Sequence, residues 1–171
     1  QGGFKVRLII AIVVALFAIL SYYGRPGDEN QATGKVERVA MADEADEVAM
    51  GLQAKPQMMQ MHGGVAPNRQ ELAHVQQVGN RLLAALDRRL ELEGHTNPYR
   101  GDFQFTLLAD PQTVNAFALP GGQVFITEAL YRALETEGQL VGVLGHEIGH
   151  VIERHSNKRL AKDQMFQGLA A

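Results

Sequence analysis

The chain contains no cysteine among its 171 residues. It can therefore form no disulfide, offer no thiolate nucleophile, bind zinc through no sulfur ligand and carry no lipid on a thiol. A basic block is absent as well, since 16 basic residues are balanced by 19 acidic ones and the formal net charge is -3. We therefore predict no nucleic-acid partner.

Charge is missing from one long stretch, Leu8 to Gly24, whose centre is apolar on all sides. Such a run is typical of a helix in lipid, and as a helix it would extend about 26 Å, against a hydrocarbon core of about 30 Å. Lys5 and Arg7 precede it, as in a cleaved signal peptide, but Ser21-Tyr22-Tyr23 lacks the small-x-small pattern of a cleavage site, and Ala32-Thr33-Gly34 lies too far downstream. We predict an uncleaved, single-pass transmembrane helix over residues 4–24 that contacts the lipid bilayer.

The residues after this helix predict the domain organisation. Two cations before the span and Arg25 after it predict a cytoplasmic N-terminus and an extracytoplasmic remainder. Residues 25–41 are polar, with Pro26 and Gly27, and predict a juxtamembrane linker. Residues 42–171 then form one domain, and its C-terminal part is expected to be missing because Ala171 falls inside a helical pattern that has no stop signal.

Hydrophobic periodicity predicts several helices in residues 42–171. Apolar residues at helical spacing predict helices over 42–53, 68–93 and 128–134, and a further helix that begins after Thr136. Asn68 and Thr136 are suitable N-caps, and Asn157 is a candidate N-cap for a final helix. In the first helix, four residues are expected to face inward: Ala45, Val48, Ala49 and Leu52.

Strands are predicted over residues 103–108, 114–119 and 123–127. The last two flank Pro120-Gly121-Gly122, which predicts a tight turn between them. The fold class is therefore α+β, mainly helical with a small β-sheet. A strand at the edge of this sheet can pair with an extended peptide through its main chain, and we expect Asn115, Ala116, Phe117 and Ala118 to bind substrate in this way.

The pentad His146-Glu147-Ile148-Gly149-His150 has the form HExxH. On a helix, positions i and i+4 share one face, so His146 and His150 can direct their imidazole nitrogens at one metal ion. Glu147 can then accept a proton from a water that Zn²⁺ activates and deliver it to a leaving amine. The pentad predicts a zinc site with His146 and His150 as ligands and Glu147 as the catalytic base.

The neighbours of the pentad predict how its helix packs. Leu144 and Ile148 supply apolar positions, and Gly142, Gly145 and Gly149 supply small ones. Together they predict a buried helix that other elements approach closely. Two histidines on such a helix need polar partners, which a metal ion provides.

Two segments in this order resemble the membrane-associated gluzincin metallopeptidases, the group of the CAAX prenyl protease and the HtpX heat-shock protease. They are VNAFALPGGQVFIT (Val114 to Thr127) and GQLVGVLGHEIGHVIERHSNKR (Gly138 to Arg159). The resemblance implies a zincin-like domain, one zinc ion, and proteolysis of membrane-associated or misfolded envelope proteins. It also implies a third zinc ligand, a glutamate on a later helix that we expect beyond the end of this chain.

The carboxylates that follow His150 within the chain are Glu153 and Asp163. Glu153 lies in one row with the two histidines, and three ligands in a row on one helix cannot surround a tetrahedral ion, which leaves Asp163 as a weak fallback. His155 is one position too early for the HExxHxxGxxH pattern, so we interpret it as a structural or supporting group.

These patterns together predict a membrane-anchored, zinc-dependent metalloendopeptidase that acts on protein or peptide substrates. The resemblance further implies a role in envelope protein quality control. The alternative function is that of a non-catalytic anchored module that binds unfolded chains through the same edge strand. Glu147 favours the enzyme, because a pure binding module has no use for a carboxylate beside the metal ligands.

Overall fold

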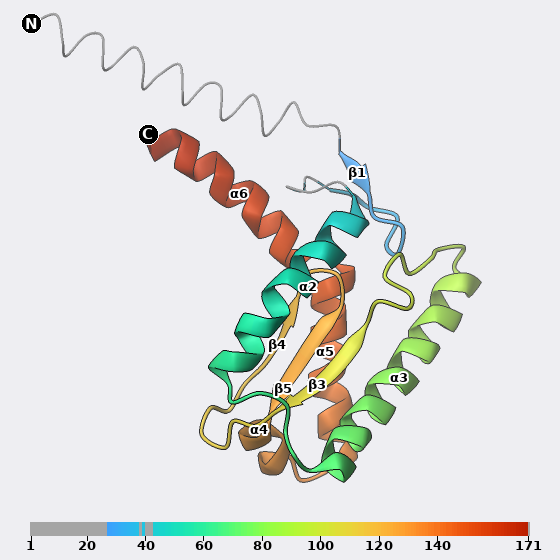
Figure 1. Ribbon diagram of the computed structural model, residues 1–171. Helices are drawn as coiled ribbons and strands as arrows, with labels where there is room; N and C mark the ends of the chain where they lie inside the picture. Colours follow the sequence, from blue (N-terminus) through green and yellow to red (C-terminus); the bar gives the residue numbers. More distant parts are fainter. Residues whose placement is uncertain (1–26, 38, 40–42, 171) are drawn as a thin grey trace, which may run out of the picture.

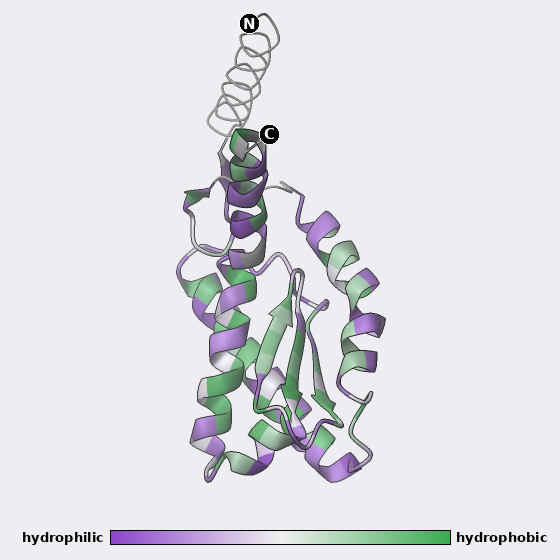
Figure 2. Ribbon diagram, turned by 90° about the vertical axis from the view of Figure 1, so that its left-hand side faces the viewer, coloured by the Kyte–Doolittle hydropathy of each residue, from purple (hydrophilic) through white to green (hydrophobic). Residues whose placement is uncertain are grey.

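The computed structural model describes residues 27–37, 39 and 43–170. A three-stranded sheet forms the middle layer, with α2 on one face and α3 and α5 on the other (Figures 1 and 2). The elements follow in the order β1 (Asp28–Glu29), β2 (Val36–Glu37), α2 (Glu44–Met61), α3 (Arg69–Leu92), β3 (Gln104–Leu108), β4 (Ala116–Leu119), β5 (Gln123–Thr127), α4 (Glu128–Ala133), α5 (Glu137–Ile152) and α6 (His155–Ala170). The predicted α+β class, helix-rich with a small sheet, is confirmed.

The predicted membrane helix over residues 4–24 lies outside the described residues. Among the helices that the structure does describe, none is both long enough and apolar enough to cross a bilayer. The predicted membrane anchor therefore stays a prediction.

The sheet has the strand order β3-β5-β4, so β4 is an edge strand. β3 and β5 are parallel, and β4 and β5 form an antiparallel hairpin. All three strands were predicted, although β4 begins at Ala116, two residues later than expected. The tight turn is confirmed too: Gly121 and Gly122 have φ angles of 85° and 119°, which glycine adopts without strain.

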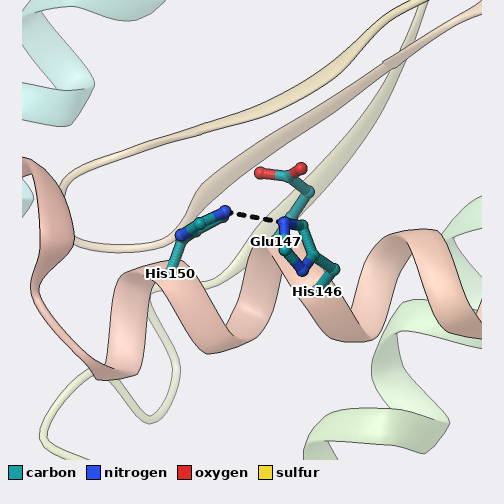
Figure 3. Close-up of side chains that lie close together, drawn as sticks. All are labelled: His146, Glu147 and His150. Atoms are coloured by element: carbon teal, nitrogen blue, oxygen red, sulfur yellow. Dashed lines mark hydrogen bonds between the residues drawn. The ribbon is translucent and has the colours of Figure 1, made fainter.

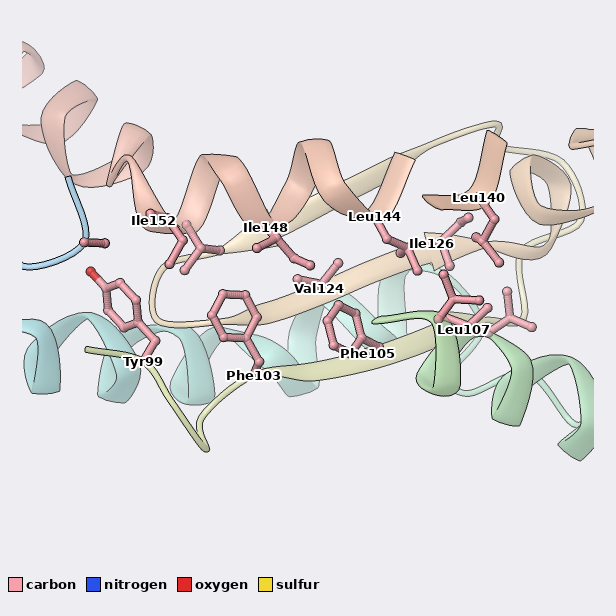
Figure 4. Close-up of a cluster of buried hydrophobic side chains, with 14 of the residues drawn as sticks. Tyr99, Phe103, Phe105, Leu107, Val124, Ile126, Leu140, Leu144, Ile148 and Ile152 are labelled. Atoms are coloured by element: carbon pink, nitrogen blue, oxygen red, sulfur yellow. The ribbon is translucent and has the colours of Figure 1, made fainter. Parts of the chain in front are cut away.

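The main core lies between this sheet and the two helices α3 and α5 (Figure 4). From α5 it receives Leu140, Leu144, Ile148, Val151 and Ile152; from the strands Phe105, Leu107, Val124 and Ile126; and from α3 Val75 and Val78. Each fully buried side chain of this size stabilises the fold by about 1.5–3 kcal/mol. The face of α5 that carries these residues is therefore firmly attached to the sheet.

Helix α3 agrees closely with its prediction. Its N-cap is Asn68, whose side-chain oxygen accepts hydrogen bonds from the main-chain N–H groups of Gln70 and Glu71. Gly94 follows its end with a φ angle of 76°. Gly79 allows the helix to pass directly over the Phe105 ring, which a Cβ at position 79 would approach to 2.5 Å.

The predicted inward face of α2 is wrong. Its buried residues are Glu47 and Gly51, whereas three of the four expected ones are exposed: Ala45, Ala49 and Leu52. Glu47 turns inward because it pairs with a buried arginine, Arg154. Gly51 turns inward because α2 passes against the carbonyl of Pro120, where any Cβ would clash. The helix also extends to Met61, with Pro56 inside it.

Residues 28–37, which lie in the predicted linker, form a small hairpin of β1 and β2. Asn30 in its loop is 1% exposed and donates a hydrogen bond from Nδ2 to the carbonyl oxygen of Ile152, at 2.7 Å. This contact attaches the hairpin to the end of α5. The sequence pattern did not predict it, because two-residue strands have no periodicity and the loop is polar.

A single residue, Arg154, separates the C-cap of α5 from α6. It has a φ angle of 54° and is the non-glycine residue with positive φ in the described ranges. This left-handed conformation costs roughly 1–2 kcal/mol for a residue with a Cβ. Helix α6 begins directly afterwards at His155, so the predicted cap Asn157 is wrong: it lies inside the helix and is buried.

The contact between α2 and the β4–β5 turn can be tested with Gly51→Ala. An added Cβ would lie 2.1 Å from the Pro120 carbonyl oxygen, so we expect the free energy of unfolding to fall by about 1–3 kcal/mol. The matched control is Gly142→Ala on α5, where a Cβ meets nothing within 4 Å. It should raise that free energy by about 0.5–1 kcal/mol. Urea denaturation measures both, and a shift of the same sign in the two variants would contradict the contact.

Candidate metal centre

Helix α5 begins as predicted. The Thr136 hydroxyl accepts a hydrogen bond from the Gln139 main-chain N–H at 3.2 Å, and the Gln139 side-chain oxygen accepts one from the Glu135 N–H at 2.7 Å. The first bond satisfies an N–H group that the first helical turn would otherwise leave unpaired, and the second ties the residue before the N-cap to the helix. The HExxH pentad therefore lies well inside a capped, regular helix, where the spacing of its side chains is fixed.

The structure brings the three pentad side chains together (Figure 3). His146 and His150 face each other through their Nε2 atoms at 2.8 Å, and potential ligand atoms of His146, Glu147 and His150 all lie within 4.8 Å of one another. Two nitrogen ligands of one tetrahedral zinc ion are about 3.3 Å apart, so the donor set fits such an ion. In the ranges that the structure describes, this is the group of histidines and carboxylates that could hold a metal.

Burial differs among the three side chains and affects their charge. Glu147 is 8% exposed, and burial raises the pKa of its carboxyl, although the charge of His146 acts in the opposite direction. His150 is half-buried. Burial lowers the pKa of its imidazole, and electrostatic interactions with His146, His155 and Arg159 lower it further. These conditions favour the neutral imidazole, which is the form that binds a metal.

The other residues weighed as ligands lie away from this group. Glu153 forms an ion pair with Lys158 at 3.8 Å, and Asp163 is exposed on α6. His155 contacts the opposite side of the His150 ring, with 2.5 Å between the two Nδ1 atoms. Among the described residues, none of the three joins the metal-binding group.

In the part of the chain that the structure describes, β4 is an edge strand with a free main-chain edge, and it lies beside α5. The Asn115 carbonyl accepts a hydrogen bond from the Thr127 N–H, and the register then pairs Phe117 with Phe125 and Leu119 with Gln123. Because bonded positions alternate in an antiparallel ladder, the N–H and C=O groups of Ala116 and Ala118 point away from β5. They are the groups that an added strand would meet.

The four residues predicted to bind substrate therefore lie in three different places. Ala116 and Ala118 present their side chains to α5, where they line the space around His146, Glu147 and His150. The Phe117 ring lies on the other face of the sheet and stacks on Phe125, with ring centroids 5.0 Å apart. Asn115 lies at the start of the strand, beside the open cavity described next.

An open cavity of about 680 Å³ lies in front of His146 and Glu147. Its other lining residues are mostly apolar and come from the start of β4, from α4 and its end, and from α5: Val114, Asn115, Ala116, Leu130, Leu134, Gln139, Gly142 and Val143. Apart from Asn115 and Ala116, the sequence pattern did not identify these residues as functional. Helix α4 carries no recognisable motif, so only its position in the fold places Leu130 and Leu134 beside the pentad.

The predicted close packing around the glycines of α5 is wrong. A Cβ added at Gly142, Gly145 or Gly149 would meet nothing within 4 Å. These glycines lie along the side of the helix that carries His146 and His150, not along the side that packs in the core. Their effect is to keep the space around the pentad open.

Comparison with known proteins identifies the family. The profile of peptidase family M48 matches residues 69–170. This segment is more than half of the chain and contains β4, the β4–β5 turn and the HExxH helix. The chain therefore belongs to peptidase family M48, a family of peptide hydrolases, which confirms the class expected from the sequence.

Individual relatives match shorter segments. The beta-barrel assembly-enhancing protease of Yersinia pestis is 36% identical over 96 residues, which cover 56% of this chain and 18% of that protein. The protein of the same name from Escherichia coli K12 is 37% identical over 44% of this chain and 15% of its own length. The mitochondrial metalloendopeptidase OMA1 of Schizosaccharomyces pombe is 41% identical over 34% of this chain and 17% of its own length. The chain thus spans less than a fifth of the relatives it matches.

Proposed function

We propose that this chain carries the catalytic centre of a zinc-dependent metalloendopeptidase. The observation that carries the proposal is the joint position of His146, Glu147 and His150 beside the free edge of β4. A metal site alone would need only the helix. The adjacent edge strand and the cavity in front of Glu147 add what a peptide hydrolase requires, namely a place for an extended chain and for one of its side chains.

His146 and His150 would hold the zinc ion through their Nε2 atoms. Bound zinc supplies Lewis acidity, lowering the pKa of a coordinated water to about 7 and polarising the scissile carbonyl. Glu147 accepts the proton that the attacking water loses and donates it to the amine that leaves. Its partly enclosed position, with the carboxylate beside both imidazoles (Figure 3), suits this exchange.

The third ligand is expected to be a glutamate on a later helix, as the family resemblance implies. Among the described residues, Glu153 and Asp163 lie outside the metal-binding group, and Glu153 is paired with Lys158. Two imidazoles and one carboxylate would leave one position of a tetrahedral zinc ion for water.

We further propose that the substrates are extended or unfolded segments of membrane-associated envelope proteins and that the domain is extracytoplasmic. Support comes from two relatives named beta-barrel assembly-enhancing proteases and from the apolar run Leu8 to Gly24. The alternative is a non-catalytic anchored module that binds unfolded chains. Both functions use β4, and only the enzyme uses Glu147.

Glu147→Gln separates metal binding from catalysis. The variant keeps both imidazoles, so we expect full zinc content in the full-length protein, but peptide hydrolysis should fall by at least about 10²–10⁴-fold because the proton acceptor is lost. His146→Ala and His150→Ala should lose zinc as well. The matched control is Glu137→Gln, which changes an exposed glutamate at the start of the same helix and should leave both properties unchanged. Casein hydrolysis and metal analysis provide the two measurements. Unchanged hydrolysis by Glu147→Gln would refute the assigned role.

Ala118→Pro tests binding along the β4 edge. Proline removes the Ala118 N–H, which points away from β5, so no bond within the sheet is lost. We expect KM for an unfolded protein substrate to rise roughly 2- to 10-fold, the value of one hydrogen bond, while kcat is largely retained. Ala118→Ser keeps the N–H and is the control. If both variants have the parent KM, the substrate does not pair with this edge.

The cavity predicts a preference for a large apolar residue beside the scissile bond. Gly142→Leu would fill part of the cavity without a clash, because a Cβ there meets nothing within 4 Å. We expect the preference to shift towards small residues, with the ratio of kcat/KM values for leucine and alanine substrates falling at least about 10-fold. Gly138→Leu, outside the cavity lining, is the control. A peptide library read by mass spectrometry measures the preference, and an unchanged profile for Gly142→Leu would exclude this cavity as the binding site.

A further inference from the structure

The His150 ring makes a contact on each of its two nitrogens. Its Nε2 faces His146 Nε2 at 2.8 Å, and its Nδ1 lies 2.5 Å from Nδ1 of His155. The rings of His150 and His155 meet edge to face, with centroids 4.8 Å apart and an interplanar angle of 66°. One nitrogen of His150 therefore faces the candidate metal position and the other faces the first residue of the next helix.

This arrangement has a consequence for the tautomer of His150. A neutral imidazole carries its proton on one nitrogen only, so of two nitrogens in hydrogen-bond contact one donates and the other accepts. If His150 donates from Nδ1 to His155, its Nε2 carries the free lone pair that a metal needs. Ligand histidines in metal sites commonly donate their second N–H to a neighbouring acceptor, which also fixes the orientation of the ring.

His155 could not reach His150 along an uninterrupted helix. A residue five positions away lies about 140° around the helix axis, on another face. Arg154 breaks the helix with its φ angle of 54°, and α6 starts in a new direction (Figure 1). The left-handed turn is thus the feature that brings the two rings together.

Buried charges hold this turn in place. Arg154 is 2% exposed, and its Nε donates to the Glu47 carboxylate at 3.0 Å while its Nη1 pairs with Asp28. Glu47 also accepts a hydrogen bond from the Tyr99 hydroxyl at 2.6 Å. The arginine is therefore tied to β1, α2 and the segment before β3, three parts of the chain that are far apart in sequence.

We propose that His155 and Arg154 are positioning residues for His150: His155 accepts the Nδ1 proton of His150 and so directs its Nε2 to the metal, and Arg154 holds the turn that places His155. The inference rests on the proposed zinc site but concerns two residues outside the HExxH pentad. A purely structural role would instead have Arg154 anchor the start of α6, without any influence on His150.

Zinc affinity of the purified full-length protein, measured by competition with a fluorescent chelator, tests the His155 contact. His155→Ala should weaken zinc binding by about 10- to 100-fold, the usual effect of losing a group that supports a metal ligand. His155→Gln, whose amide oxygen can accept the same proton, should restore most of the affinity. His74→Ala, on α3, is the control and should match the parent. His155 is exposed, so these variants should fold, and melting of the metal-free proteins checks this.

The metal-free protein gives a second readout. Nitrogen-15 NMR at alkaline pH should show the His150 proton on Nδ1 in the parent and a mixture of tautomers in His155→Ala. Parent-like zinc affinity together with a parent-like tautomer in His155→Ala would overturn the proposal. If the parent itself bound no zinc, the proposed metal site would fail, and the NMR experiment would still decide whether His155 fixes the His150 ring.

Arg154 is tested through its coupling to His155. Arg154→Gly combined with Glu47→Gln keeps a backbone suited to positive φ and removes both members of the buried ion pair. If Arg154 acts by placing His155, this double variant should bind zinc more weakly than the parent. Adding His155→Ala to the double variant should then change its zinc affinity by less than about 2-fold, because the two effects are not independent. Additive losses would show that Arg154 does not act through His155. Should the Arg154→Gly, Glu47→Gln variant unfold, Arg154→Lys can replace it, because lysine retains the positive charge but not the planar set of N–H donors. A mixture of His150 tautomers in the NMR spectrum of Arg154→Lys would show that Arg154 acts through His155, and a parent-like tautomer would show that it does not.

Discussion

The two sides of α5 have opposite requirements, and the fold is arranged around both. One side must be buried deeply enough to fix the helix on the sheet, and Leu144 and Ile148 do this at the centre of the main core. The other side must stay open if the proposed metal ion and peptide are to reach His146 and His150. Because a residue on a helix cannot change its face, the sequence has to satisfy both requirements within each turn.

The buried side of α5 was predictable, because burial leaves a periodic pattern that a single sequence displays. The same holds for α3, and the turn residues Pro120-Gly121-Gly122 correctly indicated the two strands of the β4–β5 hairpin. The candidate ligands were visible for another reason: i and i+4 histidines with an intervening glutamate have few other uses. In each of these cases the information is local.

What the sequence did not predict depends on contacts between distant segments. Arg154 interacts with Asp28 and Glu47, residues more than 100 positions away, so nothing beside it in the chain indicates that it is buried. The inward position of Glu47 was missed for the same reason, since a glutamate on a helix is usually assigned to the solvent side. The cavity walls Leu130 and Leu134 have ordinary helical spacing, and only the packing of α4 beside α5 places them at the site.

The glycines of α5 lower the stability of the helix but keep the space around the pentad open. Each glycine inside a helix costs roughly 0.5–1 kcal/mol relative to alanine, and neither Gly142 nor Gly149 recovers this cost by allowing close packing, because a Cβ at either position would meet open space. Gly51 and Gly121 differ, since α2 and the β4–β5 turn approach each other there too closely for any side chain. That contact fixes the turn and hence β4, while the glycines of α5 keep the space in front of β4 clear. The two sets of glycines therefore affect the same space beside β4. Gly51 and Gly121 hold the edge strand in position, and the glycines of α5 leave the space in front of it open.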